Sequence, residues 1–169
     1  MTGPLEKKVF WKEWSTALGV AFLPLLLASI PPFLGPSWRA LIMRVFEPFC
    51  HQMPSRSPHL WGVQLAVGHR VYGLLMGLPL GAVAFAALVR HDPALRWWAP
   101  QIFAVSALPM VVGWALGWFG LWPNTPLSRM LTGGLFGVAR VLAHARHPAG
   151  APIAGKPLNL FSRLHFRGL

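Results

Sequence analysis

The feature that most constrains this chain is a set of three long stretches without a charged residue. They cover residues 18–34, 71–89 and 97–127. A helix needs roughly 20 mainly apolar residues to cross the hydrocarbon core of a bilayer. All three stretches meet or approach that length, whereas a buried helix of a water-soluble protein is shorter and keeps a polar face. The pattern therefore predicts a membrane protein.

The amino-acid composition supports the same class. Of the 169 residues, 54% are hydrophobic and 11% are charged, whereas soluble domains carry about 25% charged residues. The length is enough for one compact unit. We predict an all-α fold, a polytopic transmembrane helical bundle. A single transmembrane domain is expected over residues 1–146, followed by a basic, extended tail over residues 147–169.

The positions of the individual elements follow from prolines, glycines and charges. Residues 1–14 combine lysines with aromatic rings, which is typical of an amphipathic segment in the headgroup region. Full spans are expected at about residues 15–33, 67–89 and 98–121. Residues 38–49 in the first loop have apolar side chains at helical spacing, which predicts an amphipathic surface helix.

A fourth hydrophobic segment, residues 127–143, is harder to assign. Its uncharged part covers only residues 130–139, and Arg129 and Arg140 could extend from its ends toward the two interfaces. A short span and an interfacial or re-entrant helix both fit this pattern, and we favour the span. The bundle would then have three to four spans.

The distribution of charge predicts an orientation in the membrane. The net charge is +11, and the basic residues lie between the apolar runs rather than in one stripe, which argues against nucleic acid as a partner. With the N-terminus inside, most Lys and Arg residues fall on the inner side, as expected for cytoplasmic loops. We expect a multi-pass protein of the bacterial cytoplasmic (inner) membrane with both termini cytoplasmic, the Cys50 loop outside and anionic phospholipids as partners.

Three segments carry glycines at four-residue spacing, a pattern that lets helix backbones approach closely in a membrane. The glycines are Gly73, Gly77 and Gly81, then Gly113 and Gly117, then Gly133 and Gly137. Each string could serve packing within the bundle or docking onto another integral-membrane subunit. Because there are three strings, we expect at least one of them to face a partner subunit.

A first group of polar residues lies where the first loop meets the second span. Cys50, His51 and His69 carry the sulfur and nitrogen atoms that bind zinc, copper or haem iron. The alternative is that Cys50 packs as a small hydrophobic residue and the histidines hydrogen-bond at the interface. The spacing of these residues leaves both interpretations open.

A second group consists of Arg70 and Arg129, each at the expected outer end of a span. A half-buried arginine is costly unless it is paired, and Glu47 is the acidic residue expected on that side. We therefore expect a structural ion pair of Glu47 with Arg70 or Arg129. Contact of the arginines with lipid headgroups is the alternative.

The sequence offers no catalytic constellation. One outward carboxylate cannot support paired acid–base catalysis. No acidic residue lies within an expected span, so the relay of an ion-coupled transporter is missing as well. We expect that the chain is not an enzyme and requires no cofactor, although a haem, pigment or metal could be held at an interface with partner subunits.

Two sequence blocks carry a resemblance to a known family. The residues of the first block are Cys50, His51, Gln52, Pro54, Arg56, Ser57, Gly62, Arg70 and Gly73. The second block is the stretch NTPLSRMLTGGLFG, residues 124–137. They resemble the DUF2085 family of uncharacterised bacterial membrane proteins, whose signature is CHQ…P-x-RS…G followed by C-x-R-C-x-G and, later, N-x-x-R-x-x-TG-x-x-x-G. The spacing before Arg129 is looser here, and the resemblance covers about residues 46–137.

The chain departs from this signature at the two later cysteines. Where the family has C-x-R-C, the sequence has Gly68, His69, Arg70 and Val71. If those cysteines form a metal or redox site with Cys50, half of that site is absent. The resemblance therefore implies a helical membrane scaffold rather than a reactive site, and it brings no established activity.

These observations lead to two functional hypotheses. The chain is small, lacks a catalytic set, and contains nine tryptophans, eleven phenylalanines and several glycine strings. We predict a small non-catalytic integral-membrane subunit of a larger membrane complex, of the respiratory or photosynthetic electron-transfer kind, that contributes to assembly and stability. The alternative is a metal- or haem-binding membrane protein with an outward-facing site of Cys50, His51 and His69.

Overall fold

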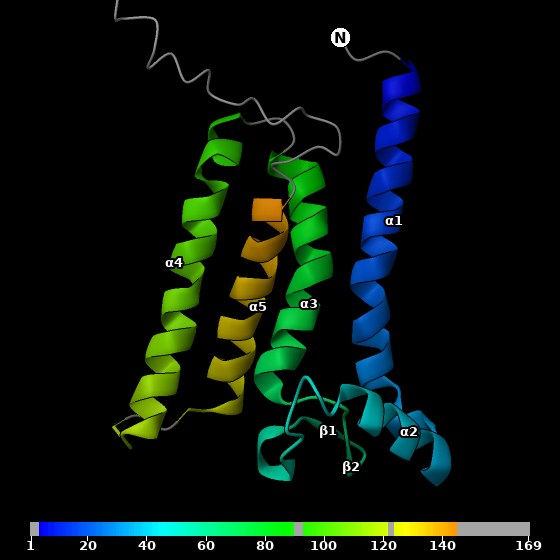
Figure 1. Cartoon of the computed structure of the whole chain (residues 1–169), viewed down its shortest axis with the longest axis vertical. Helices are drawn as coiled ribbons and strands as arrows, with labels where there is room; N and C mark the ends of the chain where they lie inside the picture. Colours follow the sequence, from blue (N-terminus) through cyan, green and yellow to red (C-terminus); the bar gives the residue numbers. More distant parts are fainter. Residues whose placement is uncertain (1–3, 90–92, 122–123, 145–169) are drawn as a thin grey trace, which may run out of the picture.

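The computed structural model describes residues 4–89, 93–121 and 124–144, and it is mainly helical (Figure 1). The tail predicted over residues 147–169 lies outside the described residues. Four long helices lie in one row in the order α1, α3, α5, α4, and a short helix, α2, crosses one end. Their bounds are Pro4–Ser29 (α1), Pro36–Phe46 (α2), His69–Ala84 (α3), Pro93–Trp118 (α4) and Pro126–His144 (α5).

The row has two distinct ends. The start of α1 and the end of α5 lie at one end, at the top of Figure 1, which we name the terminal end. The opposite end holds α2, the segment between α2 and α3, and the turn between α4 and α5, and we name it the loop end. Because the long helices alternate in direction, residues far apart in sequence meet at the loop end.

Helix α1 is one continuous helix that contains the described part of the predicted headgroup segment and most of the predicted first span. The predicted start of a new helix at about residue 15 was therefore wrong. Residues 5–18 contain neither glycine nor proline, so nothing breaks the helix there. The hydroxyls of Ser15 and Thr16 both donate to the carbonyl of Lys12 at 2.9 Å and do not cap a new helix.

Two helical segments among the described residues are long and apolar enough to cross a membrane. They are His69–Ala87, which includes α3 and part of the π-helical turn Phe85–Val89, and Trp97–Trp118 within α4. The apolar part of α1, Trp14–Ser29, is shorter. Helix α5 confirms a helix at the fourth predicted segment and lies between α3 and α4. All predicted spans are thus helices, and two of them have the length and hydropathy of a span.

The segment between α1 and α3 folds into α2 and a small hairpin, which the all-α expectation did not include. Strands β1 (His59–Leu60) and β2 (Val63–Gln64) pair antiparallel. The two residues between them, Trp61 and Gly62, have positive φ angles of 52° and 76°, the conformation of a two-residue hairpin turn. Glycine adopts this backbone without a Cβ clash, which accounts for Gly62 in the signature.

The predicted surface helix is α2, and side-chain hydrogen bonds hold it to the 3₁₀ turn Pro31–Phe33 that follows α1. The Arg39 side chain donates to the carbonyls of Pro31 and Leu34, both at 3.2 Å. Gln52 donates to the Met43 carbonyl at 2.6 Å, and its own carbonyl accepts from Gln64 at 2.6 Å. Gln52 therefore joins α2 to the hairpin, which gives this signature residue a structural role.

The glycine strings on α3 and α5 face each other. A Cβ atom on Gly73 or Gly77 would overlap the backbone of Met130 or Gly134, and one on Gly137 would overlap the Leu74 carbonyl. A Cβ atom on Gly133 would overlap the Arg70 carbonyl in the same way, and one on Gly81 would meet the backbone of Val138 less tightly. This is the close backbone approach that small residues permit. These two strings therefore pack within the chain.

The third string packs within the chain as well. Gly113 and Gly117 on α4 leave space for the side chain of Asn124, whose amide donates to the Gly113 carbonyl. The Ser128 hydroxyl donates to Asn124 Oδ1 at 3.4 Å. The glycines thus fix the turn that brings α5 back against α4.

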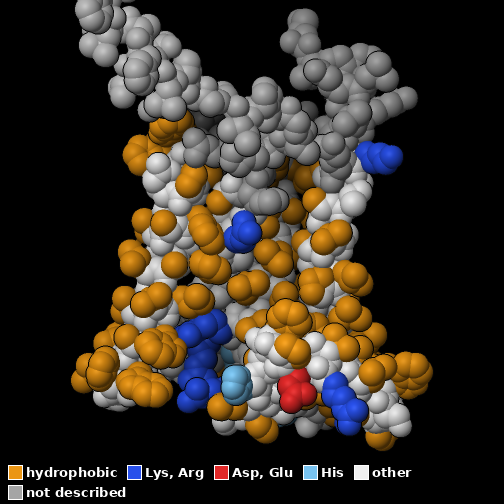
Figure 2. Space-filling model, in the orientation of Figure 1, with side chains coloured by type: hydrophobic (Ala, Val, Ile, Leu, Met, Phe, Trp, Pro, Cys, Tyr) orange, Lys and Arg blue, Asp and Glu red, His pale blue; other side chains and the backbone are white. Residues whose placement is uncertain are grey.

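Helix α4 lies at the edge of the row and leaves much of its apolar surface open. Val105, Leu108 and Val112 are each more than half exposed. Figure 2 shows hydrophobic side chains over the outer faces of the helices and a group of basic side chains near the loop end. An apolar surface of this extent is stable in lipid rather than in water.

Candidate functional site

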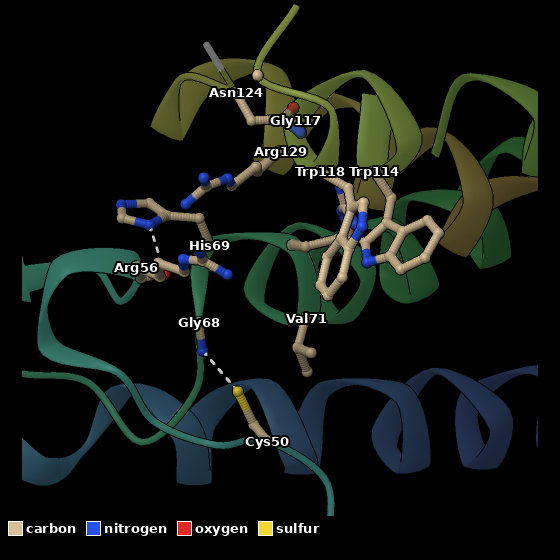
Figure 3. Close-up of a pocket in the computed structure, with 12 residues that line it drawn as sticks. Cys50, Arg56, Gly68, His69, Val71, Trp114, Gly117, Trp118, Asn124 and Arg129 are labelled. Atoms are coloured by element: carbon tan, nitrogen blue, oxygen red, sulfur yellow. Dashed lines mark hydrogen bonds between the residues drawn. The ribbon is translucent and has the colours of Figure 1, made fainter. Parts of the chain in front are cut away.

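A cavity of about 490 Å³ opens at the loop end, between the first turn of α3, the end of α4 and the start of α5 (Figure 3). Three arginines line it, Arg56, Arg70 and Arg129. We name this set the arginine cluster. Among the described residues that line the cavity there is no Asp or Glu. The cavity is therefore a concentration of positive charge in a chain that has few acidic residues.

Each arginine comes from a different element. Arg56 ends the 3₁₀ turn Pro54–Arg56, Arg70 is the second residue of α3, and Arg129 lies in the first turn of α5. The alternating direction of α3, α4 and α5 brings these sequence positions to the same end of the row. Figure 3 shows the side chains of Arg56 and Arg129 directed toward the same space beside His69.

The arginine cluster lacks a compensating anion within the described residues. Arg129 acts on Arg70 as a repulsive like charge, and Arg56 acts on Arg129 in the same way. The Nε atom of Arg70 is buried and has no hydrogen-bond partner. A buried donor without a partner costs about 1–3 kcal/mol.

The predicted ion pair of Glu47 with Arg70 or Arg129 does not form within the described part of the chain. Glu47 is exposed at the C-cap of α2, whereas the arginines line the cavity. Sequence position placed the three residues at the same end, but α2 carries Glu47 to the surface. The prediction was wrong because the carboxylate of Glu47 does not enter the cavity.

The beginning of α3 adds further donors to the cavity. Its N-cap, Gly68, has an extended backbone and offers no side-chain cap. Gly68, His69, Arg70 and Val71 all line the cavity. The first N–H groups of a helix have no partner within the helix and carry a partial positive charge. The start of α3 therefore reinforces the positive potential of the arginine cluster.

Cys50 and His69 both line the cavity, but His51 does not. The Cys50 Sγ atom accepts the backbone N–H of Gly68 at 3.1 Å. His69 Nδ1 lies 2.7 Å from the Arg56 carbonyl oxygen, and His51 is exposed. In the described part of the chain, no three His, Cys, Asp or Glu residues come together as a metal site. The alternative ligand set of Cys50, His51 and His69 is thus not assembled.

Gly68 stands where the family signature has the first cysteine of C-x-R-C, and its position shows what replaces that cysteine. A Cβ atom on Gly68 would lie 3.5 Å from Cys50 Sγ. A cysteine at residue 68, as in the C-x-R-C pattern, would therefore place its thiol beside Cys50. In this chain, the backbone N–H of Gly68 contacts Cys50 instead, and the sulfur packs with the hydrophobic core around Val67 and Phe46.

The wall of the cavity on the side of α4 is aromatic. Trp114 and Trp118 stack with their ring centroids 5.8 Å apart and an interplanar angle of 26°. They are 57% and 76% exposed, and Figure 3 shows them beside the space that the charged side chains enter. The site residues predicted from the sequence did not include these two tryptophans or Arg56, although Arg56 belongs to the signature and the tryptophans have a four-residue spacing at the end of a span.

The cavity offers three guanidinium groups and one imidazole. His69 is the one histidine among the described lining residues, and its Nδ1 atom lies 2.7 Å from the Arg56 carbonyl oxygen. Arginine presents a planar array of donors that matches phosphate and carboxylate oxygens. An anion is therefore the ligand that the cavity can hold best.

Comparison with known proteins identifies a family. The model of a predicted membrane protein family, DUF2085, matches residues 50–143, a segment that contains every described residue lining the cavity. An uncharacterised protein of Methanocaldococcus jannaschii is 25% identical over 127 residues, which are 70% of this chain and 79% of the relative. That organism is an archaeon. No solved structure matches the chain. The family model covers more than half of the sequence, and the chain belongs to the DUF2085 family of predicted membrane proteins.

Proposed function

We propose that this membrane protein binds an anionic ligand in the arginine cluster and does not catalyse a reaction. The observation that carries the proposal is the set of Arg56, Arg70 and Arg129 around one cavity that no described acidic residue lines. Like charges repel, so the set costs stability unless a ligand neutralises it. An unpaired cluster of this kind is more readily explained by binding than by stability.

The start of α3 supports the same proposal. A helix N-terminus offers backbone N–H groups and a favourable dipole to an anion. The long helix α3 begins at His69 without a side-chain cap. A bound anion could accept hydrogen bonds from the first turn and from the buried Arg70 Nε atom, which would satisfy donors that otherwise have no partner.

The test is anion binding by the purified full-length protein in detergent. Pyrophosphate is the probe, and calorimetry or a thermal-shift titration measures the affinity. We expect binding that weakens with added salt, because the contacts are electrostatic. Arg70→Gln and Arg129→Gln should each weaken it by about tenfold or more, as expected for the loss of a charge-assisted hydrogen bond. Arg44→Gln is the matched control, since Arg44 is exposed on α2 and does not line the cavity.

The proposal is wrong if wild-type protein binds no anion, or if Arg44→Gln weakens binding as much as the two cavity variants do. The second result would mean that the overall charge of +11 attracts anions without a site.

A second proposal is that the chain serves as a small non-catalytic subunit of a larger complex in the bacterial cytoplasmic membrane, of the electron-transfer kind, with other integral-membrane subunits as partners. The open apolar face of α4 supports it, because another membrane helix could pack there. The glycine strings no longer support it, since they pack within the chain. Purification in mild detergent from native membranes should recover electron-transfer subunits, and isolation as a stable monomer would contradict the proposal.

A further inference from the structure

The cavity has two chemically different walls. The arginine cluster and the start of α3 form the basic wall, and the stacked pair Trp114 and Trp118 forms the aromatic wall. A small hydrophilic anion needs only the basic wall. The aromatic wall offers apolar area that such an anion would leave exposed.

The cavity lies at the level along the helices where a membrane surface is expected. One candidate span begins at His69 and the other ends at Trp118, and both residues line the cavity. The cavity thus lies where the two apolar segments end, which is the level of the headgroups. Tryptophan is enriched at that level because its ring is apolar and its N–H is polar.

An apolar chain leaving the cavity past Trp114 would continue along α4. The side chains of Val111 and Leu108 lie further along this helix and are 54% and 57% exposed. They would give the chain a continuous apolar surface toward the terminal end. A ligand with an anionic head and a hydrocarbon chain therefore matches both walls and the face next to them.

The charge of the cluster indicates the kind of head group. Three arginines and the partial charge at the start of α3 exceed the single negative charge of a phosphodiester. A phosphate monoester carries about −1.5 to −2 at neutral pH, and a diphosphate carries more. The cavity of about 490 Å³ is many times larger than the space that one ordered water needs. It has room for either head group and the first atoms of a chain.

We infer that the ligand is a lipid whose head group is a phosphate monoester or a diphosphate, with its phosphate on the arginine cluster and its chain beside Trp114 and Trp118. This inference rests on the proposed anion binding and adds the ligand class to it. A free phosphate or diphosphate has the same head-group chemistry, so the experiment separates the lipid from the soluble anion.

The experiment measures binding to the delipidated full-length protein in detergent by native mass spectrometry. Dioctanoyl phosphatidic acid supplies the monoester, dioctanoyl phosphatidylglycerol the diester and dioctanoyl phosphatidylcholine the neutral head. Inorganic pyrophosphate is the soluble arm. We expect phosphatidic acid to bind about tenfold tighter than phosphatidylglycerol because of its additional charge, and phosphatidylcholine to bind weakest.

Variants of two kinds test which wall binds the phosphate and which wall binds the hydrocarbon chain. Arg129→Gln should weaken both phosphatidic acid and pyrophosphate by about tenfold. Trp118→Ala should weaken phosphatidic acid by several-fold and leave pyrophosphate unchanged, and Trp118→Phe should restore most of the lipid affinity. Trp38→Ala is the control, because Trp38 is a similarly exposed tryptophan on α2 outside the cavity. Circular dichroism verifies that each variant retains its helix content.

The outcomes separate this inference from the proposed function. If pyrophosphate binds through Arg129 but phosphatidic acid has no advantage over phosphatidylglycerol, or if Trp118→Ala leaves the lipid affinity unchanged, the lipid inference is wrong and anion binding stands. If neither phosphatidic acid nor pyrophosphate depends on Arg129, both are wrong.

Discussion

The side chain of Arg70 lies in the first turn of α3 with its Nε atom buried and without a hydrogen-bond partner. The charged group that acts on it is Arg129, which carries the same charge. In contrast, Arg39 at the same end of the molecule donates to two backbone carbonyls. The two arginines therefore differ in what they contribute to the unliganded protein, although both belong to the loop end.

Replacing each of these arginines by glutamine should change stability in opposite directions. Arg70→Gln should raise the free energy of unfolding by about 1 kcal/mol, because it removes a like charge and a buried donor without a partner. Arg39→Gln should lower it by about 1 kcal/mol, because two charged hydrogen bonds are lost. Denaturant titration in detergent without added anion measures both changes, and added salt should reduce the gain for Arg70→Gln. A loss of stability in Arg70→Gln would mean that Arg70 has a structural partner.

At the scale of single residues, the sequence placed Arg70 and Arg129 correctly at one end of the bundle, but not their surroundings. Glu47 was the one acidic residue expected on that side, so the pattern favoured a pair. The direction of the Glu47 side chain depends on the end of α2, where the chain leaves it exposed. Charge in the sequence does not indicate which side chains the fold turns toward each other.

At the scale of elements, the pairing of α3 with α5 holds the site together. Arg70 and Arg129 lie in the first turns of these two helices, and the glycines that follow bring the two backbones into contact. Since the arginines repel each other, close packing of the glycines keeps them at one cavity. The arrangement of the arginines in the cavity therefore depends on the distance between α3 and α5.

Gly77→Ala should destabilise the protein, because the added methyl group would overlap the α5 backbone at Gly134. Overpacking of this kind typically costs about 1–3 kcal/mol. Gly19→Ala on α1 is the matched control: a Cβ atom there meets nothing within 4 Å, so better helix propensity should stabilise it by up to about 1 kcal/mol. Denaturant titration followed by circular dichroism measures both, and equal effects of the two changes would contradict the packing of α3 on α5.

The helices themselves were largely predicted, but the boundaries and connecting segments between them were not. Long apolar runs located α3, α4 and the apolar part of α1, because a span has a minimum length. Sequence reasoning placed a boundary within α1 where lysines and tryptophans give way to apolar residues, but a change in polarity does not end a helix. The hairpin β1–β2 was missed because two-residue strands have no detectable periodicity.

At the scale of the whole molecule, the row of helices puts the start of α1 and the end of α5 at one end and the cavity at the other. In a membrane, these two ends face opposite compartments if the helices span it. The basic residues near the start of α1 favour the cytoplasm for the terminal end. The cavity would then open toward the outer surface.

Cysteine labelling tests this orientation in a Cys50→Ser background. Gly35→Cys introduces an exposed thiol at the loop end, and Lys12→Cys introduces one near the start of α1. A membrane-impermeant maleimide should label residue 35 in intact cells and residue 12 only after the cells are permeabilised. Labelling of both in intact cells would contradict opposite compartments, and the reverse pattern would put the cavity on the cytoplasmic side.

The sequence by itself determined the class of environment and the positions of the long helices, because transfer into a bilayer depends on the length and composition of a segment. It also supplied the glycines that allow close packing. Only the tertiary structure decided which glycines face each other, and that Arg56, Arg70 and Arg129 meet beside Trp114 and Trp118. These residues are distant in the chain, so their proximity depends on helix order, direction and rotation, which no local pattern encodes.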